Sequence, residues 1–332
     1  MEKVFSVNTE LYKVTGVQKV LMDIHHAVQS DYDARIAGTK PYKQVNKAHG
    51  IKREEYIQWK NPFMFHNSIV IVHERKLLLL FWILNTFLYQ KIKIVYIHHS
   101  LFYNHKLTTI LPRTIISISD RVTENLISFF GAKKEYIHKI CNCVQDINPK
   151  PHKSCSSDKI RILYPARINN GKRQIEICQR LQGKIDSKIE ILFVGTGPLY
   201  EEFKNTIKNN EQFKILGFRN DVYKLLQECD YMMLFSTHEG LPITLIEAAM
   251  CGTPIICNDV GGNCEIAHDK KNAFVVNEWE ELITTLNNLP NVATDTYRMM
   301  SENSRRIYES NFTFDKFKEN YLQLLKQIAN ER

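Results

Sequence analysis

Short apolar runs alternate with amphipathic stretches along most of the chain. Residues 68–73, SIVIVH, have the length and composition of a buried strand, and residues 18–28 place Leu21, Ile24 and Val28 at the spacing of one helix face. Strands that alternate with helices in this way predict parallel sheets of Rossmann type, whose ligands bind at the carboxyl ends of the strands.

A stretch without an apolar run divides this pattern in two. Residues 147–158, INPKPHKSCSSD, carry two Pro and three Ser, which is typical of a linker. A second series of strands and helices follows and continues through the apolar run at 231–235. At 332 residues the chain is long enough for two domains, and we expect them to cover residues 1–150 and 151–312.

Two N-terminal stretches depart from the alternation. Residues 34–61 are polar and rich in Lys and Tyr, so that loops, short strands or an acceptor-facing segment all fit them. Residues 74–91, ERKLLLLFWILNTFLYQK, are apolar on nearly every side, which favours a buried helix over one that lies on a membrane surface. The apolar run within them, residues 77–89, is too short to span a bilayer.

Charge is distributed unevenly over a net total of +8. Residues 1–150 hold 21 Lys and Arg against 12 Asp and Glu, whereas residues 151–332 hold 23 against 24. A basic N-terminal half suits an anionic membrane surface or an acidic acceptor. No nucleic-acid-binding motif accompanies the basic residues, so we expect no nucleic-acid partner.

Cysteine usage and the N-terminus bear on the compartment. The eight cysteines include no C-x-x-C pair, which favours reduced thiols over disulfides or a zinc site. The opening MEKVFSVNTE does not resemble a signal peptide. We therefore expect a cytoplasmic protein, either free or peripheral on the cytoplasmic face of the membrane.

The most informative stretch is residues 236–265, where two glutamates eight positions apart surround the start of a predicted helix. Glu239 lies in a loop after an apolar run, Pro242 suits the first helical position, and about ten helical residues lead to a left-handed cap at Gly252. At about 1.5 Å per residue, Glu247 lies about 8 Å into this helix. One glutamate is thus positioned for the near end of a ligand and the other for its far end.

The start of the same helix predicts an anion site. The free backbone amides of Gly240, Leu241 and Ile243 point in the direction of the positive end of the helix dipole. A diphosphate is an anion of suitable size for such a site.

Residues 238–254, HEGLPITLIEAAMCGTP, resemble the E-x7-E donor signature of the retaining glycosyltransferases of family 4. The resemblance implies the GT-B fold, an α/β architecture in which two Rossmann-like domains face each other across a cleft. It also implies that Glu239 contacts the transferred sugar, that Glu247 binds the ribose hydroxyls, and that the helix start holds the donor diphosphate.

Other segments of the second half match the same family in order and approximate spacing. Arg167 and Lys172 occupy a loop similar to the "GRl…KG" loop of the family, which would place both on the diphosphate. A glycine turn and a segment that frames the base follow. The donor-binding positions implied in this half are Gly195, Gly197, Gly217, Phe218, Arg219, Asp221, Gly240, Leu241, Pro242, Ile243 and Glu247.

The N-terminal half matches more loosely. Gly16 lies where the family has a glycine loop after its first strand, usually with two glycines. The segment IHHS resembles the end of a strand whose histidine reaches the donor sugar, which implies His98, with His99 as the alternative. At the end of the N-terminal domain, Cys143 and Gln145 replace the Gly and Asp of the family pattern.

These matches imply a domain organisation. Residues 1–150 would form the acceptor domain and residues 151–312 the nucleotide-sugar domain. Residues 313–332 would form a terminal helix that crosses back to the N-terminal domain.

The resemblance also implies a reaction, in which a hexose moves from a nucleotide-diphosphate sugar to a glycan or lipid-linked glycan of a cell-surface polysaccharide, with retention. The residues expected to act in it are His98, Arg167, Lys172 and Glu239. Because two cations and a helix start would meet the leaving-group charge, we expect neither a metal ion nor a cofactor. Two alternatives stay open: a GT-B sugar-nucleotide epimerase, and a non-catalytic sugar-nucleotide-binding protein.

Overall fold

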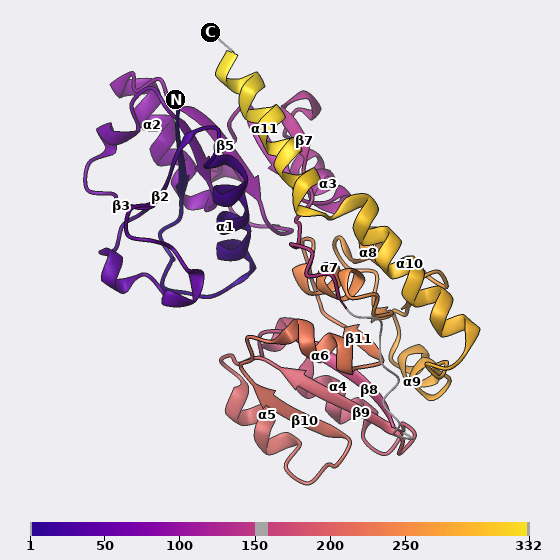
Figure 1. The fold of residues 1–332 in the computed structure, drawn as a ribbon. Coiled ribbons are helices and arrows are strands. Elements are labelled where there is room, and N and C mark those ends of the chain that lie inside the picture. Colours follow the sequence, from indigo (N-terminus) through magenta and orange to yellow (C-terminus); the bar gives the residue numbers. More distant parts are fainter. Residues whose placement is uncertain (1, 150–158, 331–332) are drawn as a thin grey trace. The chain divides into compact units, whose positions relative to one another are not determined.

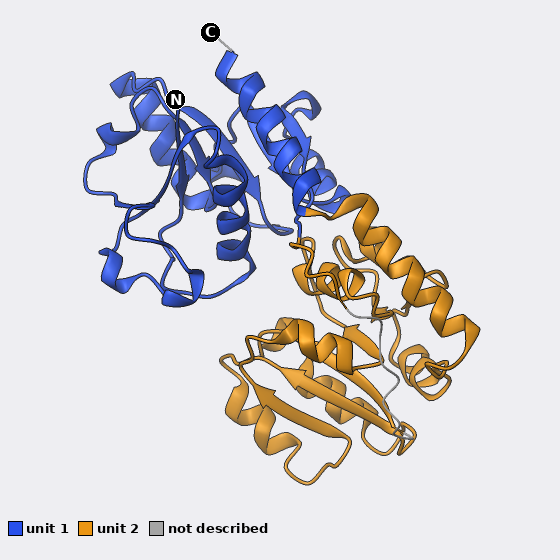
Figure 2. Cartoon of the chain, viewed as in Figure 1, with its two compact units in different colours: residues 1–143, 314–332 blue, residues 144–313 orange. Residues whose placement is uncertain are grey.

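The structure, a computed structural model, describes residues 2–149 and 159–330 and divides the chain into two compact units (Figures 1 and 2). Unit 1 comprises residues 1–143 and 314–332, and unit 2 comprises residues 144–313. The linker predicted at residues 147–158 lies largely outside the described residues.

Unit 1 is built on a seven-stranded parallel sheet with the order β3-β2-β1-β4-β5-β6-β7. The order reverses between β1 and β4, and ligands of open α/β sheets bind at the carboxyl ends of the strands at such a switch point. The strands are β1 (Lys3–Val7), β2 (Asp33–Gly38), β3 (Tyr56–Gln58), β4 (Ile69–Val72), β5 (Lys93–His98), β6 (Thr114–Ser117) and β7 (Ile137–Lys139).

The central strands of unit 1 are apolar because helices cover both faces of a parallel sheet. All four residues of β4 are buried, and Val7 of β1 pairs with Val72 at its carboxyl end. The long helices of this unit are α1 (Gly16–Val28), α2 (Leu78–Leu88), α3 (Asp120–Ser128) and α11 (Phe314–Asn330).

Helix α11 belongs to unit 1 although it follows all of unit 2 in the chain (Figure 2). It packs against α1 and buries Phe317, Tyr321 and Leu325. The Nζ of Lys93, on β5, donates a hydrogen bond of 2.8 Å to the carbonyl oxygen of Ala329.

The polar stretch 34–61 contains two strands and short 3-10 turns. Its first residues belong to β2, and β3 adds three residues at the edge of the sheet. The 3-10 turns cover Tyr42–Gln44 and Lys47–His49.

The prediction of a buried helix within residues 74–91 is wrong. Helix α2 buries Leu78, Phe81 and Leu84, but most of its other apolar side chains are exposed. Phe81 packs against Trp59 and Phe65, with ring centroids at 5.6 and 5.4 Å, so only this side of the helix meets the core. An apolar composition all round cannot by itself indicate how many sides of a helix are covered.

Unit 2 repeats the architecture with a six-stranded parallel sheet in the order β10-β9-β8-β11-β12-β13. Its order reverses between β8 and β11, which makes the carboxyl ends of these two strands the second switch point. The strands are β8 (Ile160–Pro165), β9 (Ile189–Val194), β10 (Phe213–Gly217), β11 (Tyr231–Leu234), β12 (Ile255–Cys257) and β13 (Ala273–Val275).

Seven helices are described in unit 2. They are α4 (Gln174–Leu181), α5 (Tyr200–Thr206), α6 (Val222–Glu228), α7 (Ile243–Met250), α8 (Asn263–Ile266), α9 (Trp279–Asn287) and α10 (Asp295–Asn311). Helix α7 has eight residues, and Pro242 is its N-cap rather than its first helical residue. Gly252 has a φ of 69°, the left-handed conformation predicted for it.

No helix within residues 2–149 and 159–330 is long and apolar enough to cross a bilayer. The seven cysteines in these ranges are all free thiols.

Candidate active site

Predicted site residues of unit 2 gather at the carboxyl edge of its sheet. Four neighbouring strands end there in the order β10, β9, β8, β11. Gly217 ends β10, Gly195 follows β9, Arg167 follows β8 and Glu239 follows β11. Positions 72 residues apart in sequence thus come to one edge at the switch point, where α/β sheets bind their ligands.

Tyr164 joins the two loops at this switch point. Its hydroxyl donates to the carbonyl oxygen of Lys172 at 2.7 Å and accepts from the backbone N–H of Phe235 at 3.1 Å. Burial raises the pKa of Tyr164, so the hydroxyl keeps its proton. The N–H of Thr237 also donates to the carbonyl oxygen of Gly171, at 2.9 Å. The loops after β8 and β11 are therefore held together by three backbone attachments.

Lys172 and Glu239 form an ion pair across these loops. The Glu239 side chain is 8% exposed and that of Lys172 is 23% exposed, so the pair is largely shielded from water. A carboxylate buried to this degree requires a cationic or hydrogen-bonding partner. Among the described residues this edge therefore holds one buried charged pair in front of α7.

Arg167 differs from Lys172 in having no such partner. Its side chain is exposed, and it makes no hydrogen bond or ion pair with the residues the structure describes. Its carbonyl oxygen accepts from Gln174 Nε2 at 3.1 Å, which fixes the loop rather than the guanidinium. The guanidinium is thus available to an anionic ligand.

Gly261 fixes the backbone of Glu239 by close approach. It has a φ of 56°, and a Cβ added there would lie 2.0 Å from the carbonyl oxygen of Glu239. The N–H of Gly262 donates to the carbonyl oxygen of Gly240 at 2.7 Å. Sequence reasoning did not single out this pair, although a Gly-Gly step after a strand is a signal of close backbone contact.

Gly195 and Gly197 press the turn after β9 against the loop that carries Arg167. A Cβ at Gly195 would lie 2.2 Å from the carbonyl oxygen of Ala166, and one at Gly197 would lie 2.1 Å from that of Ile168. No side chain larger than hydrogen fits at either position. The two glycines thus allow a contact between backbones at the edge of the sheet.

The segment after β10 lies next to this turn. The N–H of Gly195 donates to the carbonyl oxygen of Gly217 at 2.8 Å. Phe218 is 58% exposed, and Arg219 pairs with Asp221 through contacts of 2.7 and 2.5 Å. The segment therefore offers one exposed aromatic ring beside a charged pair.

The start of α7 completes the edge. Gly240, Leu241 and Pro242 are buried, Ile243 is half-buried, and the first amides of α7 have no side-chain cap. Glu247 is half-buried one turn further along the helix. Backbone amides at the start of a helix attract anions, and Glu247 lies one turn deeper along this helix.

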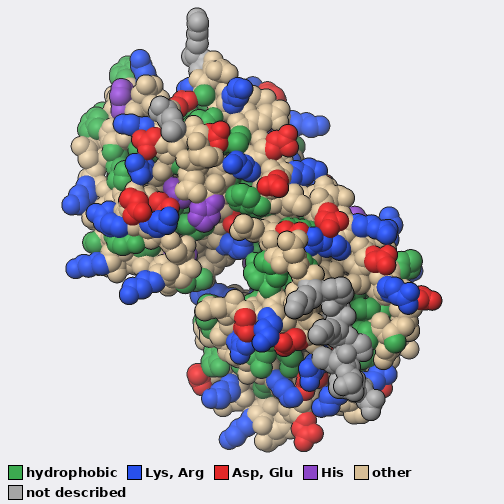
Figure 3. Space-filling model, viewed as in Figure 1, with side chains coloured by type: hydrophobic (Ala, Val, Ile, Leu, Met, Phe, Trp, Pro, Cys, Tyr) green, Lys and Arg blue, Asp and Glu red, His purple; other side chains and the backbone are tan. Residues whose placement is uncertain are grey.

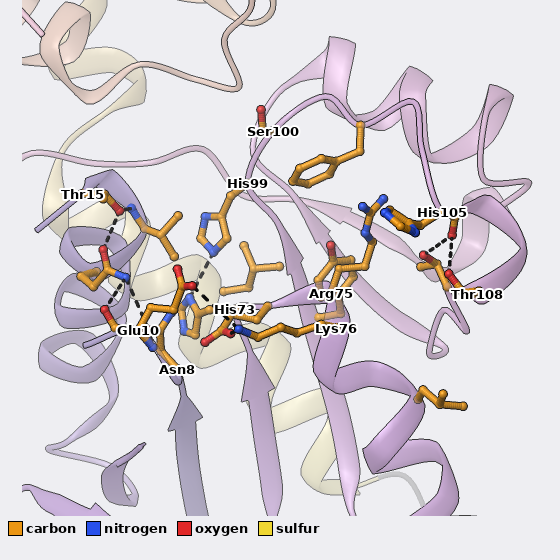
Figure 4. Close-up of a pocket in the computed structure, with 18 residues that line it drawn as sticks. Asn8, Glu10, Thr15, His73, Arg75, Lys76, His99, Ser100, His105 and Thr108 are labelled. Atoms are coloured by element: carbon orange, nitrogen blue, oxygen red, sulfur yellow. Dashed lines mark hydrogen bonds and ion pairs between the residues drawn. The ribbon is translucent and has the colours of Figure 1, made fainter. Parts of the chain in front are cut away.

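Unit 1 contains a cavity of about 660 Å³ at its own switch point (Figure 4). Asn8 and Glu10, which follow β1, line it together with His73 to Lys76, which follow β4. Gly16, the first residue of α1, is flanked by Thr15 and Val17, which line the cavity.

His98, the histidine predicted to reach the donor sugar, is not among the residues that line this cavity. It is fully buried, and its ring nitrogens lie 3.0 Å from the Tyr96 hydroxyl and 3.2 Å from Asn125 Oδ1. Burial lowers the pKa of His98 to about 4, which keeps the ring neutral. Because β5 ends at His98, the side chain of His99 points in a different direction from that of His98.

His99, the alternative, lines the cavity (Figure 4). Its ring stacks on His73 with centroids at 5.3 Å, and its Nε2 lies 3.1 Å from His73 Nδ1. Burial lowers the pKa of both histidines, so this pair shares one hydrogen bond between neutral rings. The Nε2 of His73 is buried and has no hydrogen-bond partner among the described residues.

Charged side chains line the same cavity as the two histidines. Lys76 Nζ lies 2.7 Å from a carboxylate oxygen of Glu74 and 3.8 Å from one of Glu10. Arg75 donates to Asn104 at 2.9 and 2.7 Å, and its guanidinium lies 4.5 Å from the centre of the Phe102 ring. Sequence reasoning missed these residues, although they directly follow β4 at a strand end where ligands are expected.

Within residues 2–149 and 159–330, no three His, Cys, Asp or Glu side chains are grouped closely enough to hold an ion.

Comparison with known proteins gives one family match, to glycosyl transferases group 1, over residues 147–307. The chain is 28% identical over 143 residues to the Escherichia coli protein named UDP-Gal:alpha-D-GlcNAc-diphosphoundecaprenol alpha-1,3-galactosyltransferase, covering 40% of this chain and 37% of that protein. It is 24% identical over 232 residues to the Staphylococcus aureus capsular polysaccharide biosynthesis glycosyltransferase CapH, covering 61% and 63%. The matches thus span between about a third and two thirds of the length of these relatives.

A solved structure resembles the chain over nearly its whole length. The Anabaena protein Alr3699/HepE, crystallised with UDP, superposes with a TM-score of 0.82 and covers 98% of this chain and 100% of that protein. The two are 19% identical in sequence, so the likeness concerns the fold.

Proposed function

Residues 147–307 belong to the group 1 glycosyltransferases and the chain has the GT-B fold, and on this premise we propose that the protein is a retaining, metal-independent glycosyltransferase. It moves a hexose from a nucleotide-diphosphate sugar to an acceptor. The observation that carries the proposal is the buried Lys172–Glu239 pair in front of α7, with Arg167, whose side chain has no partner among the described residues, in the same loop as Lys172.

In this proposal the donor lies along the carboxyl edge of unit 2. Glu239 accepts hydrogen bonds from the sugar hydroxyls, and Lys172 and Arg167 bind the diphosphate together with the first amides of α7. Glu247 binds the ribose hydroxyls. The base lies at the segment from Gly217 to Asp221, where the exposed ring of Phe218 supports stacking.

The chemistry follows from where charge develops. As the bond between the sugar and the outer phosphate breaks, negative charge gathers on that phosphate, and the acceptor hydroxyl bonds to the sugar on the same face. The leaving phosphate takes the proton of that hydroxyl, so that no side chain is needed as a base. Fixed cations aimed at the phosphate stabilise the transition state more than the ground state, which lowers the barrier.

Unit 1 supplies the acceptor site in this proposal. Its cavity at the switch point is lined by carboxylates, cations and the His73–His99 pair, and side chains of this kind bind sugar hydroxyls. His99 replaces His98 as the histidine available to a ligand, because both ring nitrogens of His98 already have partners.

The acceptor class is proposed from the relatives. The E. coli relative is named for a diphosphoundecaprenol-linked acceptor and the S. aureus relative for capsular polysaccharide. We therefore propose a glycan or lipid-linked glycan of a cell-surface polysaccharide as acceptor, used at the cytoplasmic face of the membrane. The basic N-terminal half supports an anionic surface nearby.

A panel of sugar nucleotides, beginning with UDP-sugars, tests the proposal with purified protein. A transferase releases nucleoside diphosphate, and a GT-B epimerase yields an isomeric sugar nucleotide. If the protein only binds the sugar nucleotide, the ligand raises the protein's melting temperature but is not turned over. The same panel is repeated with a chelator, and loss of activity there would overturn metal independence. The proposal fails if no donor in the panel is turned over.

A further inference from the structure

Helix α2 presents an apolar face that no described residue covers. Leu78, Phe81 and Leu84 are buried on the opposite side of the helix. The residues of the apolar face are between 38% and 78% exposed. We call this surface the α2 face; it consists of Leu79, Leu80, Trp82, Ile83, Phe87, Leu88 and Tyr89. Scattered exposed apolar residues are ordinary, but a contiguous group of this size marks an interaction surface.

The charged residues next to the α2 face indicate what kind of partner this surface contacts. Along the sequence, Glu74 is the one carboxylate between residues 56 and 119. On the visible face of unit 1, Lys and Arg side chains lie among hydrophobic ones, together with some Asp and Glu side chains (Figure 3). Two cations precede the helix directly and two follow it; of these, Lys76 pairs with Glu74 and Glu10, and Lys93 lies 3.5 Å from Glu2. The seven cations of this segment are Lys60, Arg75, Lys76, Lys91, Lys93, Lys106 and Arg113.

An apolar helix with cations at both ends matches the boundary of an anionic bilayer. Its hydrocarbon side chains enter the outer part of the acyl region while the flanking cations contact lipid phosphates. At about 1.5 Å per residue the helix is about 16 Å long, which suits a helix that lies in the plane of the interface. Trp82 and Tyr89 are side chains that favour this boundary.

The α2 face is continuous with the cavity of unit 1. Leu79 belongs to both, and Arg75 and Lys76 line the cavity just before the helix begins. Leu107, 98% exposed, lies beside Thr108, which also lines the cavity. Its wall carries polar and charged side chains, among them Glu10 and His99, and the buried Nε2 of His73 has no hydrogen-bond partner among the described residues. The cavity with its surroundings is therefore amphiphilic, with polar walls and apolar side chains at its rim.

We propose that the α2 face inserts into the interface of an anionic membrane and that the cavity binds the polar head of a lipid-linked acceptor. The hydrocarbon chain of this acceptor then lies along the α2 face. This inference rests on the proposed function and chooses the lipid-linked class over soluble glycans. The membrane then holds the acceptor and the cavity at the same depth, which raises the effective concentration of the acceptor at the cavity.

Vesicle sedimentation tests membrane binding through the α2 face, and it requires neither donor nor acceptor. Wild type should pellet at low ionic strength with vesicles that contain anionic lipid and remain in solution with purely zwitterionic ones. The double variant Trp82→Glu/Phe87→Glu should lose at least about tenfold in binding. Its matched control, Ile127→Glu/Met299→Glu, adds the same charge at exposed apolar positions on α3 and α10 and should bind as wild type.

Fluorescence locates the contact on the helix. Brominated lipid should quench a component of the wild-type emission that is absent in Trp82→Phe. Membrane binding through the α2 face would be refuted if wild type did not pellet with anionic vesicles, or if the Trp82→Glu/Phe87→Glu variant pelleted equally well. Either result would hold whatever the donor panel shows.

Activity tests the acceptor class. Whichever sugar head wild type accepts should react at least about tenfold faster on a polyprenyl chain in anionic vesicles than on a short water-soluble chain. The Trp82→Glu/Phe87→Glu variant should lose this preference and keep its rate on the short-chain form. Equal rates on both forms in wild type would overturn the acceptor class while leaving the transferase function intact.

Discussion

Replacing Lys172 with alanine should slow turnover far more than it weakens donor binding. In the structure its ammonium pairs with Glu239, and in the proposed reaction it lies against the outer phosphate as that group gains charge. Loss of one preorganised donor to a developing oxyanion costs about 3–4 kcal/mol, or about 100- to 1,000-fold in rate. The dissociation constant of the donor should change much less, because only part of this charge exists before the bond breaks.

The same substitution should also lower stability, for a reason that the structure gives. Glu239 is 8% exposed, and without Lys172 its carboxylate loses its ion-pair partner. Removing one partner of a fully buried pair costs about 3–5 kcal/mol, and because the Lys172 side chain is 23% exposed we expect about 1–3 kcal/mol. A melting experiment on the free protein measures this loss apart from the loss of rate.

Arg167→Ala is the matched control. This side chain is exposed and has no partner among the described residues, so its loss should cost a similar factor in turnover and leave the melting temperature unchanged. The double variant Lys172→Ala/Glu239→Gln should recover stability but not activity, since the buried carboxylate charge is gone along with the cation. Initial rates at saturating donor and calorimetric donor affinities complete the set. Near-normal turnover of Lys172→Ala under saturating donor would refute the reasoning.

Three further predictions concern other parts of the molecule. Glu247→Ala should weaken binding of the free nucleoside diphosphate as well as of the donor, because ribose contacts exist before and after transfer; calorimetry with unchanged affinity would exclude this residue from the site. Gly261→Ala should reduce activity by displacing Glu239, whereas Gly131→Ala, which has a φ of 74° and open space around it, should cost stability alone. Because burial lowers the pKa of His98 from 6.5 to about 4, folding should lose up to about 3 kcal/mol as pH falls from 6.5 to 4, and melts of His98→Asn should show a shallower slope over that window.

The parallel architecture and the loop and helix that carry Glu239 and Glu247 were predictable because their signals are periodic or local. Apolar runs of strand length mark β4 and β11, and the loop, proline and glutamate pattern from Glu239 to Glu247 marks the start of α7. The resemblance to a known family added the order of the loops. Within α7 the sequence still misjudged the first residue, because Pro242 fits both an N-cap and a first helical position.

Two features depended on information that the sequence does not contain. Adjacent side chains of a strand point to opposite faces, so choosing between His98 and His99 requires knowing where β5 ends relative to its neighbours. The exposure of α2 depends on which elements cover it, and a helix that is apolar on all sides gives no periodic signal of a free face. The cavity residues after β4 were accessible from topology alone, because Glu74 to Lys76 follow a strand at the switch point.

The placement of α11 has a consequence for the order in which the protein is made. The ribosome delivers residues 1–143 first, but α1 lacks its packing partner until residues 314–330 emerge, after the whole of unit 2. Unit 2 is one uninterrupted segment and can fold while the ribosome is still at work. The first unit to be synthesised is thus the last to be finished, and during that interval the surface later covered by Phe317, Tyr321 and Leu325 is open to chaperones.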